Sequence, residues 1–255
     1  MPRTIKGETQ LSRNRAAKAQ KRMAYQVENT IPFDSAQQPH KGRAVHLVPR
    51  TRNQESLVLA LLDAETHIVV TAGPAGTGKT YLAMQAAVKA FKEGACERII
   101  LTRPAVGVED ERHGFLPGNL VAKMEPWTRP LLDVLREYYR PQDIMAMIED
   151  QVIEIAPLAY MRGRTFKNAW LIADEMQNAT PAQVKMLMTR IGQDSKIVIT
   201  GDVEQADRRR GDNGLLDLCE RLKKQGVDGI TVCSMGTKDV QRHKIIESVL
   251  NLYAD

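Results

Sequence analysis

Residues 73–80 read Gly-Pro-Ala-Gly-Thr-Gly-Lys-Thr, and this stretch matches the phosphate-binding loop pattern GxxxxGK[ST] in full. An apolar run typical of a strand, residues 67–72, precedes the loop, and a run typical of a helix begins at Tyr81. A glycine-rich turn between a strand and a helix directs successive backbone N–H groups at bound phosphates. The sequence therefore predicts that the chain binds a nucleoside triphosphate.

The loop pattern also predicts individual roles. Lys79 is expected to reach the β- and γ-phosphates, and the Thr80 hydroxyl to bind Mg²⁺. Gln54, some 20 residues before the loop, is a plausible contact to the adenine edge, although a lone glutamine is more often a surface residue. The candidate nucleotide-binding residues are Gln54, Gly73, Pro74, Ala75, Gly76, Thr77, Gly78, Lys79, Thr80 and Tyr81.

Strand-like and helix-like runs alternate after residue 53, which predicts an α/β fold with a parallel sheet and helices on both faces. The phosphate loop then lies at the carboxyl ends of the strands. Expected strands are 68–72, 98–102, 152–155, 170–174, 196–200 and 229–233; expected helices are a short one ending near residue 62, then 80–92, 120–139, 181–191, 214–224 and 238–250.

Two acids, Asp174 and Glu175, follow the apolar run 170–173. At the carboxyl end of a strand beside the phosphate loop, Asp174 is expected to hold Mg²⁺ and Glu175 to orient or deprotonate the attacking water. Adjacent carboxylates are also common at ordinary helix starts. The buried-type strand before them favours the catalytic interpretation.

A second polar group follows the strand-like run 196–200, where Gly201 and Asp202 are followed by Gln205. This strand is expected to lie beside the first one and to bring polar groups opposite the γ-phosphate. A residue there can sense the γ-phosphate and pass the difference to a moving loop. The alternative is an ordinary strand followed by a polar turn.

Charge is unevenly distributed along the 255 residues. Residues 1–52 hold 11 lysines and arginines against 3 acidic residues, whereas the remainder holds 25 against 28. We expect a basic N-terminal arm and linker (1–52) followed by one nucleotide-binding domain (53–255). A basic arm favours a nucleic-acid partner, and its alternative is a solvated tail that aids solubility.

No apolar stretch approaches the roughly 20 residues that a membrane span requires. The first residues carry charges with no apolar run behind them, so no secretory signal is expected. Three cysteines at unrelated spacings fit a reducing compartment better than a disulfide framework or a metal site. These features predict a cytoplasmic protein.

Beyond the phosphate loop, the chain contains further motifs in a fixed order. They are 102–104 (Thr-Arg-Pro), 114–118 (Gly-Phe-Leu-Pro-Gly), 155–165 (Ile-Ala-Pro-Leu-Ala-Tyr-Met-Arg-Gly-Arg-Thr), 174–178 (Asp-Glu-Met-Gln-Asn), 186–190 (Met-Leu-Met-Thr-Arg) and 200–205 (Thr-Gly-Asp-Val-Glu-Gln). With these motifs the chain resembles the PhoH family of ATPases, and the resemblance covers about four-fifths of the chain, from near Gln54 to the C-terminus.

The resemblance implies a P-loop NTPase with a single RecA-like core, related to superfamily-one RNA helicases, that binds and hydrolyses ATP with Mg²⁺. By matching position, it implies that Lys79, Glu175, Gln205 and Arg242 are catalytic and that Thr80 and Asp174 hold the metal. Some family members are described as RNA helicases. One departure is Met176, where the family has a small residue, and we expect this side chain to crowd the site.

A single phosphate loop leaves the source of an arginine finger open, since motor helicases place ATP between two such cores. The finger comes in cis or from a neighbouring copy, and the candidates are Arg162, Arg164, Arg190 and Arg242. A homo-oligomer, most simply a six-membered ring, follows as a hypothesis. Single-stranded RNA is the expected partner, with DNA as a further possibility, and the candidate contacts are Arg103, Tyr160, Arg162 and Arg164.

Two other functions compete with an RNA-coupled ATPase. A kinase that transfers the γ-phosphate to a small molecule is disfavoured, because Asp174, Glu175 and Gln205 suit water as the acceptor. An ATP-dependent switch or adaptor that recruits a nuclease or a ribosome-associated partner is separated poorly by residues alone. RNA-stimulated turnover distinguishes that switch from a motor.

Overall fold

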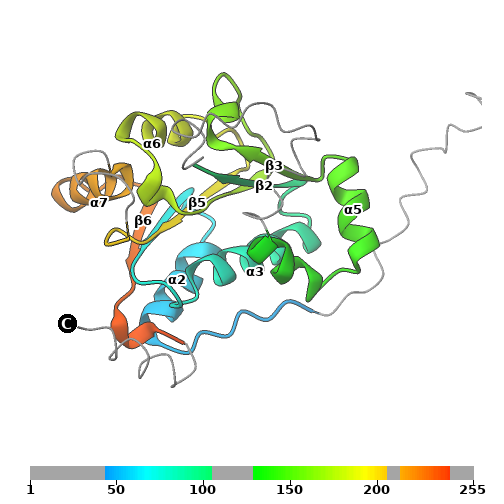
Figure 1. The fold of residues 1–255 in the computed structure, drawn as a ribbon, viewed down its shortest axis with the longest axis horizontal. Helices are drawn as coiled ribbons and strands as arrows, with labels where there is room; N and C mark the ends of the chain where they lie inside the picture. Colours follow the sequence, from blue (N-terminus) through cyan, green and yellow to red (C-terminus); the bar gives the residue numbers. More distant parts are fainter. Residues whose placement is uncertain (1–43, 105–128, 206–212, 242–255) are drawn as a thin grey trace, which may run out of the picture. The chain divides into compact units, whose positions relative to one another are not determined.

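The computed structural model describes residues 44–104, 129–205 and 213–241. These residues form a parallel six-stranded sheet in the order β3-β2-β4-β5-β1-β6 (Figure 1). The strands are β1 (Ile68–Ala72), β2 (Arg98–Arg103), β3 (Ile153–Pro157), β4 (Ala169–Ala173), β5 (Lys196–Gly201) and β6 (Ile230–Ser234).

Helices cover both faces of this sheet (Figure 1). One face packs against α2 (Arg52–Leu62), α3 (Lys79–Lys92), the helical residues 129–136 and α5 (Pro141–Glu149). The other face packs against α6 (Pro181–Met188), α7 (Gly214–Lys224) and the 3₁₀ turns η1 (Leu158–Met161) and η2 (Met176–Asn178). Alternate residues of each strand therefore enter two separate cores, as Val69 and Val70 of β1 illustrate.

The strand order confirms the α/β prediction and places the sites that depend on it. β5 lies next to β1, with Thr71 opposite Thr200 and Ala72 opposite Gly201. β4 lies on the other side of β5. The segments that follow β1, β4 and β5 therefore leave the sheet side by side at its carboxyl edge.

The predicted strands agree with the structure to within two residues, and the largest difference among the helices is α5. No helix is predicted from the sequence at residues 141–149, although Ile144, Met147 and Ile148 recur at helical spacing and pack on the core. Local signals nevertheless start it: Pro141 occupies the first turn, and the Asp143 carboxylate accepts hydrogen bonds from the Arg140 guanidinium at 2.9 Å. Helix α6 is also shorter than the expected 181–191, ending at Met188. Of the expected helix 238–250, residues 242–250 lie outside the described part of the chain, and residues 238–241 contain the end of the 3₁₀ turn η4 (Thr237–Asp239) and no α-helix.

Residues 44–50 form an extended segment that packs on the α2–α3 side, although the sequence suggests a linker here. Val45 and Leu47 pack against the core, whereas His46 and Val48 are exposed. The sequence-based boundary at residue 52 therefore assigns to the arm a segment that contributes to the core. The rest of the basic arm, residues 1–43, lies outside the described part of the chain.

Candidate nucleotide-binding and hydrolysis site

The candidate site begins with the phosphate loop, which connects β1 to α3. Gly78 immediately precedes α3 with φ 81°, a left-handed conformation that glycine adopts without a steric penalty. No side chain caps the start of α3. The first N–H groups of a 14-residue helix are therefore available to an anion, as a phosphate site requires.

The root of the loop is fixed by the two strands that flank β1. The Gly73 amide donates to the Gly201 carbonyl at 3.2 Å, and the Met235 amide donates to the Ala72 carbonyl at 2.8 Å. A Cβ atom on Gly73 would lie 2.4 Å from the Met235 carbonyl oxygen, so position 73 has no room for a side chain.

Lys79 is buried beneath this loop. Its ammonium group donates to the carbonyls of Gly73 and Pro74, at 2.7 and 2.8 Å. An amine on a flexible stem can exchange such carbonyl partners for phosphate oxygens. The structure thus holds Lys79 beside the position that the loop pattern predicts for phosphate.

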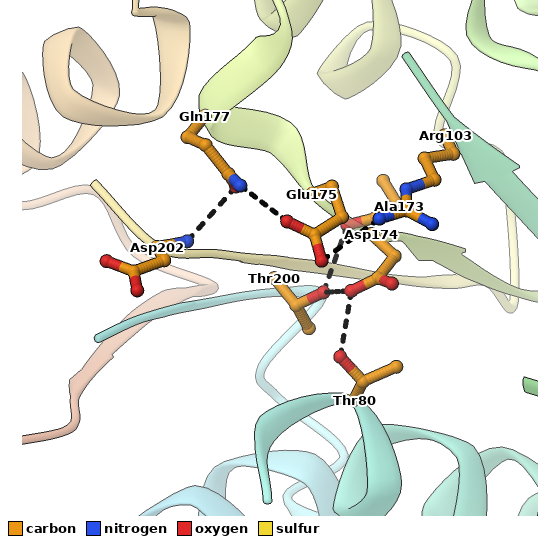
Figure 2. Close-up of polar contacts among 8 residues, drawn as sticks. All are labelled: Thr80, Arg103, Ala173, Asp174, Glu175, Gln177, Thr200 and Asp202. Carbon is orange, nitrogen blue, oxygen red and sulfur yellow. Dashed lines mark hydrogen bonds and ion pairs between the residues drawn. The ribbon is translucent and has the colours of Figure 1, made fainter. Parts of the chain in front are cut away.

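The metal-ligand candidates meet at one carboxylate oxygen. Asp174 Oδ1 accepts a hydrogen bond from Thr80 Oγ1 at 2.8 Å and another from Thr200 Oγ1 (Figure 2). The Asp174 amide donates to the Thr102 carbonyl at 3.0 Å, which joins the end of β4 to β2. Hydrogen bonds from α3 and β5 thus hold the Asp174 carboxylate, and β2 holds its backbone, at the start of α3.

Glu175 lies next to this cluster in an unusual backbone conformation, with φ 54°. A non-glycine residue in the left-handed region is uncommon and is often found at functional sites. Its carboxylate pairs with the Arg103 guanidinium at 3.1 Å and accepts a hydrogen bond from the Gln177 side-chain amide (Figure 2). Two fixed partners therefore orient the candidate general base.

Gln177 links Glu175 to the end of β5. Its side-chain oxygen accepts a hydrogen bond from the Asp202 amide at 3.1 Å (Figure 2). Gln177 is buried, and a Cβ atom on Gly201 would lie 2.5 Å from its side-chain oxygen. The position of the Glu175 carboxylate is thus coupled to the start of the segment that carries Gln205.

These groups open into one cleft of about 330 Å³, lined by Lys79, Thr80, Asp174, Glu175 and Gln205 among others. The Gln205 side chain is exposed, and the backbone N–H of Gln205 donates to the Asp202 carbonyl at 3.2 Å. The structure therefore brings the predicted loop, metal and catalytic residues together, except Arg242, which lies outside the described residues.

The donor set of this cleft fits Mg²⁺. Thr80 and Asp174 offer hard oxygen ligands, and Mg²⁺ is commonly held by one or two protein oxygens together with substrate phosphates and water. Within the described ranges, no group of three or more His, Cys, Asp or Glu residues forms a metal site. A metal held jointly with a nucleotide agrees with this arrangement.

Gln54 is placed at the loop with its amide already engaged. Its Nε2 donates to the Thr77 carbonyl at 3.0 Å, and its Oε1 accepts from the Arg50 amide at 2.7 Å. The side chain is 4% exposed. Gln54 thus joins α2 to the phosphate loop, a role that its sequence position alone does not suggest.

The nucleic-acid candidates are divided by their contacts. Tyr160 is 60% exposed on η1, and Arg162 after it is exposed as well. Arg164, by contrast, pairs with the Glu154 carboxylate, and its guanidinium lies 4.7 Å from the centre of the Phe166 ring. Arg103 is the partner of Glu175 described above. The exposed pair is therefore better placed to meet a nucleic acid.

Among the candidates for an arginine finger, Arg190 is bound within its own chain, as Arg164 is. Arg190 donates from Nε to the Met186 carbonyl at 3.1 Å and from Nη1 to the Arg164 carbonyl at 3.2 Å. It therefore holds the end of α6 against the segment that follows η1.

Met176, expected to crowd the site, is instead fully buried in the core under α6 and α7.

Two contacts of this site escape a reading of the sequence. Gln177 lies within the matching stretch 174–178, which signals importance without a role. The pairing of Arg103 with Glu175 joins residues 72 positions apart, and only the β2–β4 neighbourhood reveals it.

The fold and the site define a P-loop nucleoside-triphosphatase class, with a phosphate loop after β1 and an acidic pair after β4. The family model described as "PhoH-like protein" matches residues 46–254. The chain belongs to the PhoH-like protein family.

Relatives with curated names support this assignment. The chain is 45% identical over 213 residues to the PhoH-like protein of Bacillus subtilis (strain 168), covering 84% of this chain and 65% of the relative. It is 46% identical over 219 residues to the PhoH-like protein of Mycobacterium leprae (84% and 60% covered), and 36% identical over 217 residues to protein PhoH of Escherichia coli K12 (80% and 60%). The chain thus spans about three-fifths of the length of these relatives.

Solved structures resemble the chain only remotely. The Pyrococcus furiosus Hef helicase domain is 12% identical with a TM-score of 0.43, covering 76% of this chain and 39% of that one. The Pif1 helicase from Candida albicans is 13% identical with a TM-score of 0.36, covering 80% and 44%. The family assignment therefore rests on the sequence relatives.

In the parts of the chain that the structure describes, no helix has both the length and the apolar character to cross a membrane.

Proposed function

We propose that the chain is an Mg²⁺-dependent ATPase that couples hydrolysis to the binding and remodelling of RNA. The observation that carries the hydrolytic part is the convergence of Lys79, Thr80, Asp174 and Glu175 on one cleft. Together they supply a phosphate-binding cation, two metal ligands and a proton acceptor for phosphoryl transfer to water, and hydrogen bonds hold each of them in place.

The roles follow from the contacts. Lys79 gives up its loop carbonyls and donates to phosphate oxygens, offsetting their negative charge. Thr80 and Asp174 would hold Mg²⁺, which when bound neutralises charge on the phosphates. Glu175, oriented by Arg103 and Gln177, accepts a proton from the attacking water. The water oxygen bonds to the γ-phosphorus while the bond between the γ-phosphorus and the bridging oxygen of the β-phosphate breaks.

The hydrogen bond from the Asp202 amide to Gln177 provides a route from hydrolysis to movement. Because Gln177 also donates to Glu175, a shift of Glu175 on γ-phosphate release changes the start of the segment that leads to Gln205. Such a difference between two states is what a remodelling ATPase needs.

The RNA-binding part is supported by exposed side chains and by the charge of the arm. Tyr160 offers an aromatic face to a base, and Arg162 offers charge to the phosphate backbone. The basic arm, with 11 lysines and arginines against 3 acidic residues in 1–52, adds sequence-independent attraction to RNA or DNA.

We also propose that the protein works as a homo-oligomer, in its simplest form a six-membered ring. Arg164 and Arg190 are bound within their own chain, which leaves Arg162, among the described candidates, to reach a neighbouring site. Sedimentation velocity with and without ATP tests this, and a monomer under both conditions contradicts it.

The experiment is ATP hydrolysis with and without single-stranded RNA, in the native protein and in Lys79→Ala. We expect hydrolysis that rises with RNA and falls at least about 100-fold in the variant, because a preorganised donor to the transferring phosphoryl group is lost. Lys89→Ala is the matched control, since Lys89 lies on the same helix and pairs with Glu93 at the surface.

Two outcomes contradict the proposal at different levels. Hydrolysis that persists in Lys79→Ala would exclude this cleft as the site. Hydrolysis that depends on Lys79 but is indifferent to RNA would favour the switch or adaptor function, and a nuclease or ribosome-associated partner would then be sought.

A further inference from the structure

Two hydrogen bonds hold the phosphate loop through its carbonyl groups. The Gly76 carbonyl accepts from the backbone N–H of Gln241 at 2.8 Å, and the Thr77 carbonyl accepts from Gln54 Nε2 at 3.0 Å. A Cβ atom on Gly78 would lie 3.2 Å from the same Gln54 nitrogen, so this side chain lies directly against the loop. The two donors come from segments far apart in the sequence, one at the start of α2 and the other after β6.

These bonds set the direction of two N–H groups. The peptide groups 76–77 and 77–78 are trans, and in a trans peptide the carbonyl of one residue and the N–H of the next point in opposite directions. A Gly76 carbonyl directed at Gln241 turns the Thr77 N–H away from Gln241. A Thr77 carbonyl directed at Gln54 likewise turns the Gly78 N–H away from Gln54. Since the N–H groups of this loop pattern bind phosphate, the carbonyl partners orient the phosphate donors.

A single carboxylate joins the segments that supply these partners. Asp239 Oδ2 accepts from the backbone N–H of Gly236 and from Asn53 Nδ2, both at 2.7 Å. Asp239 ends the 3₁₀ turn η4, two residues before Gln241, and Asn53 precedes Gln54 in the first turn of α2. Figure 1 shows the segment after β6, in red, beside the start of α2, in blue.

The Asp239 carboxylate is buried, with a relative exposure of 3%. Burial alone acts to raise its pKa, but hydrogen bonds from the Gly236 amide and from the Thr51 and Asn53 side chains lower the pKa below the ordinary value of 3.8. The Thr51 hydroxyl in turn accepts from the backbone N–H of Gln54 at 3.2 Å. Asp239 is therefore charged at neutral pH, and hydrogen bonds to a charged acceptor are stronger than those to a neutral one.

We infer that Asp239 is a positioning residue for the phosphate loop, because it joins the segments of Gln54 and Gln241 that fix the loop carbonyls. The inference rests on the proposed nucleotide site. It adds a residue that does not line the cleft containing Lys79 and Asp174 and that acts only through its neighbours. Phosphate affinity then depends on a contact between the start of α2 and η4.

The test measures dissociation constants of Mg·tripolyphosphate and Mg·ATP by calorimetry in the native protein, Asp239→Ala and Asp239→Asn. We expect Asp239→Ala to weaken both ligands by about tenfold, because two phosphate donors lose their fixed direction. Removal of a negative charge alone has the opposite effect, since it favours an anionic ligand. Asp239→Asn keeps an oxygen acceptor in the same place, and we expect its affinities to stay within about threefold of the native values.

Val184→Ala is the control for a general loss of stability. Val184 is buried in the core on the other face of the sheet, so its truncation is expected to destabilise the fold and to leave both dissociation constants unchanged. Hydrogen exchange at the backbone N–H of Gln241 provides a second measurement. We expect this exchange to be faster in Asp239→Ala and to slow in the native protein when tripolyphosphate is bound.

The contrary results separate the inference from the proposed function. A tripolyphosphate affinity of Asp239→Ala within about threefold of the native value, or a loss that Val184→Ala shares, overturns the positioning role and leaves the nucleotide site intact. Failure of the native protein to bind either ligand refutes the proposed function itself.

Asn53→Ala covers the case in which Asp239→Ala does not fold. Asn53 is exposed, and its truncation removes one donor to Asp239 without leaving a cavity in the core. We expect about threefold weaker tripolyphosphate binding and faster exchange at Gln241. Native values for both quantities in Asn53→Ala overturn the inference.

Discussion

The carboxyl ends and the amino ends of the parallel strands, here called the carboxyl edge and the amino edge of the sheet, each have a lysine nearby. The ammonium group of each lysine donates to backbone carbonyls. At the carboxyl edge, Lys79 donates to Gly73 and Pro74, which belong to the phosphate loop. At the amino edge, Lys196 donates to the carbonyls of Leu61 and Asp63, at 2.9 and 2.6 Å. Both lysines form the same kind of hydrogen bond, but the carbonyls belong to different kinds of segment.

At the amino edge the carbonyls belong to the C-terminal end of α2, where a cation is favourable to the helix dipole. The Lys196 ammonium also lies 5.4 Å from the centre of the Trp170 ring. Lys196 therefore caps a helix and keeps its partners, whereas Lys79 rests on a loop whose phosphate ligands can replace them. The comparison teaches that a lysine bonded to backbone carbonyls indicates function only through the segment that carries those carbonyls.

The largest effect is expected from a substitution of Glu175, whose carboxylate lies at the carboxyl edge. Glu175→Gln removes the proton acceptor while keeping the shape of the side chain, so we expect ATP turnover to fall about 10²–10⁴-fold. ATP binding is expected to stay within about threefold, since Glu175 is placed to act on water and not on the loop phosphates. Steady-state hydrolysis and ATP titration measure the two quantities.

Glu93→Gln is the control for that substitution at the amino edge, where Glu93 pairs with Lys89 at the surface. We expect no change in turnover. Native-like turnover in Glu175→Gln would show that another group takes the proton.

The next effect compares a glycine at each edge. A methyl group on Gly201 would lie 2.5 Å from the Gln177 side-chain oxygen and 2.6 Å from Leu215, whereas one on Gly226, in the connection before β6, meets no atom within 4 Å. We expect Gly201→Ala to lower the free energy of unfolding by about 1–3 kcal/mol through overpacking. Gly226→Ala is expected to change it by less than about 0.5 kcal/mol.

Urea denaturation of both glycine variants provides the measurement, and hydrolysis provides a second one. Displacement of Gln177 releases Glu175, so turnover is expected to fall in Gly201→Ala alone. Equal stability of the two variants would mean that the Gln177 contact adjusts without cost.

The smallest effect concerns the amino edge itself. Lys196→Met removes the donor to the end of α2 but keeps an apolar stem over Trp170. We expect the free energy of unfolding at pH 7 to change by no more than about 1 kcal/mol, because the lost hydrogen bonds and the removed cost of burying the ammonium group oppose each other. ATP turnover is expected to stay unchanged. A loss of turnover at unchanged stability would contradict the structural role of Lys196.

The pH dependence of this difference sharpens the test. Burial lowers the pKa of Lys196 to about 8, against the partial opposition of the Asp63 carboxylate. Between pH 8 and the ordinary lysine value of 10.5, the unfolded chain therefore binds a proton that the folded chain lacks, so the stability contributed by Lys196 rises with pH. The gap between native protein and variant should widen across that window. Burial raises the pKa of Cys96 from 9.0 to about 11, so the stability that depends on this thiol falls as the pH rises between those values. The native protein and Lys196→Met both contain Cys96, so this effect cancels in their difference.

Much of the fold follows from sequence, because strand runs such as 68–72 are short, apolar and bounded by turns. The phosphate loop and the acidic pair are equally visible, since their chemistry requires fixed residue types at fixed spacings. The matched carboxyl ends of β1, β4 and β5 then bring those motifs together without further information.

Other parts depend on contacts that no local pattern encodes. Residues 44–48 (Ala-Val-His-Leu-Val) are largely apolar, which is a strand-like signal, but Gly42 and Pro49 on either side favour a linker. The Tyr81–Glu137 hydrogen bond spans 56 residues, and the role of Gln54 depends on a carbonyl of the folded loop. These arrangements arise from tertiary packing and become visible only with coordinates.

One consequence comes from the root of the phosphate loop. Gly73 and Met235 tie the loop to β5 and β6 through main-chain hydrogen bonds, and the close approach at position 73 excludes a side chain. A displacement of the loop root is therefore expected to move the backbones of β5 and β6 directly, because main-chain hydrogen bonds join them. Among substitutions, those at Gly73 are expected to disturb this connection most directly, because a Cβ atom there would lie 2.4 Å from the Met235 carbonyl oxygen.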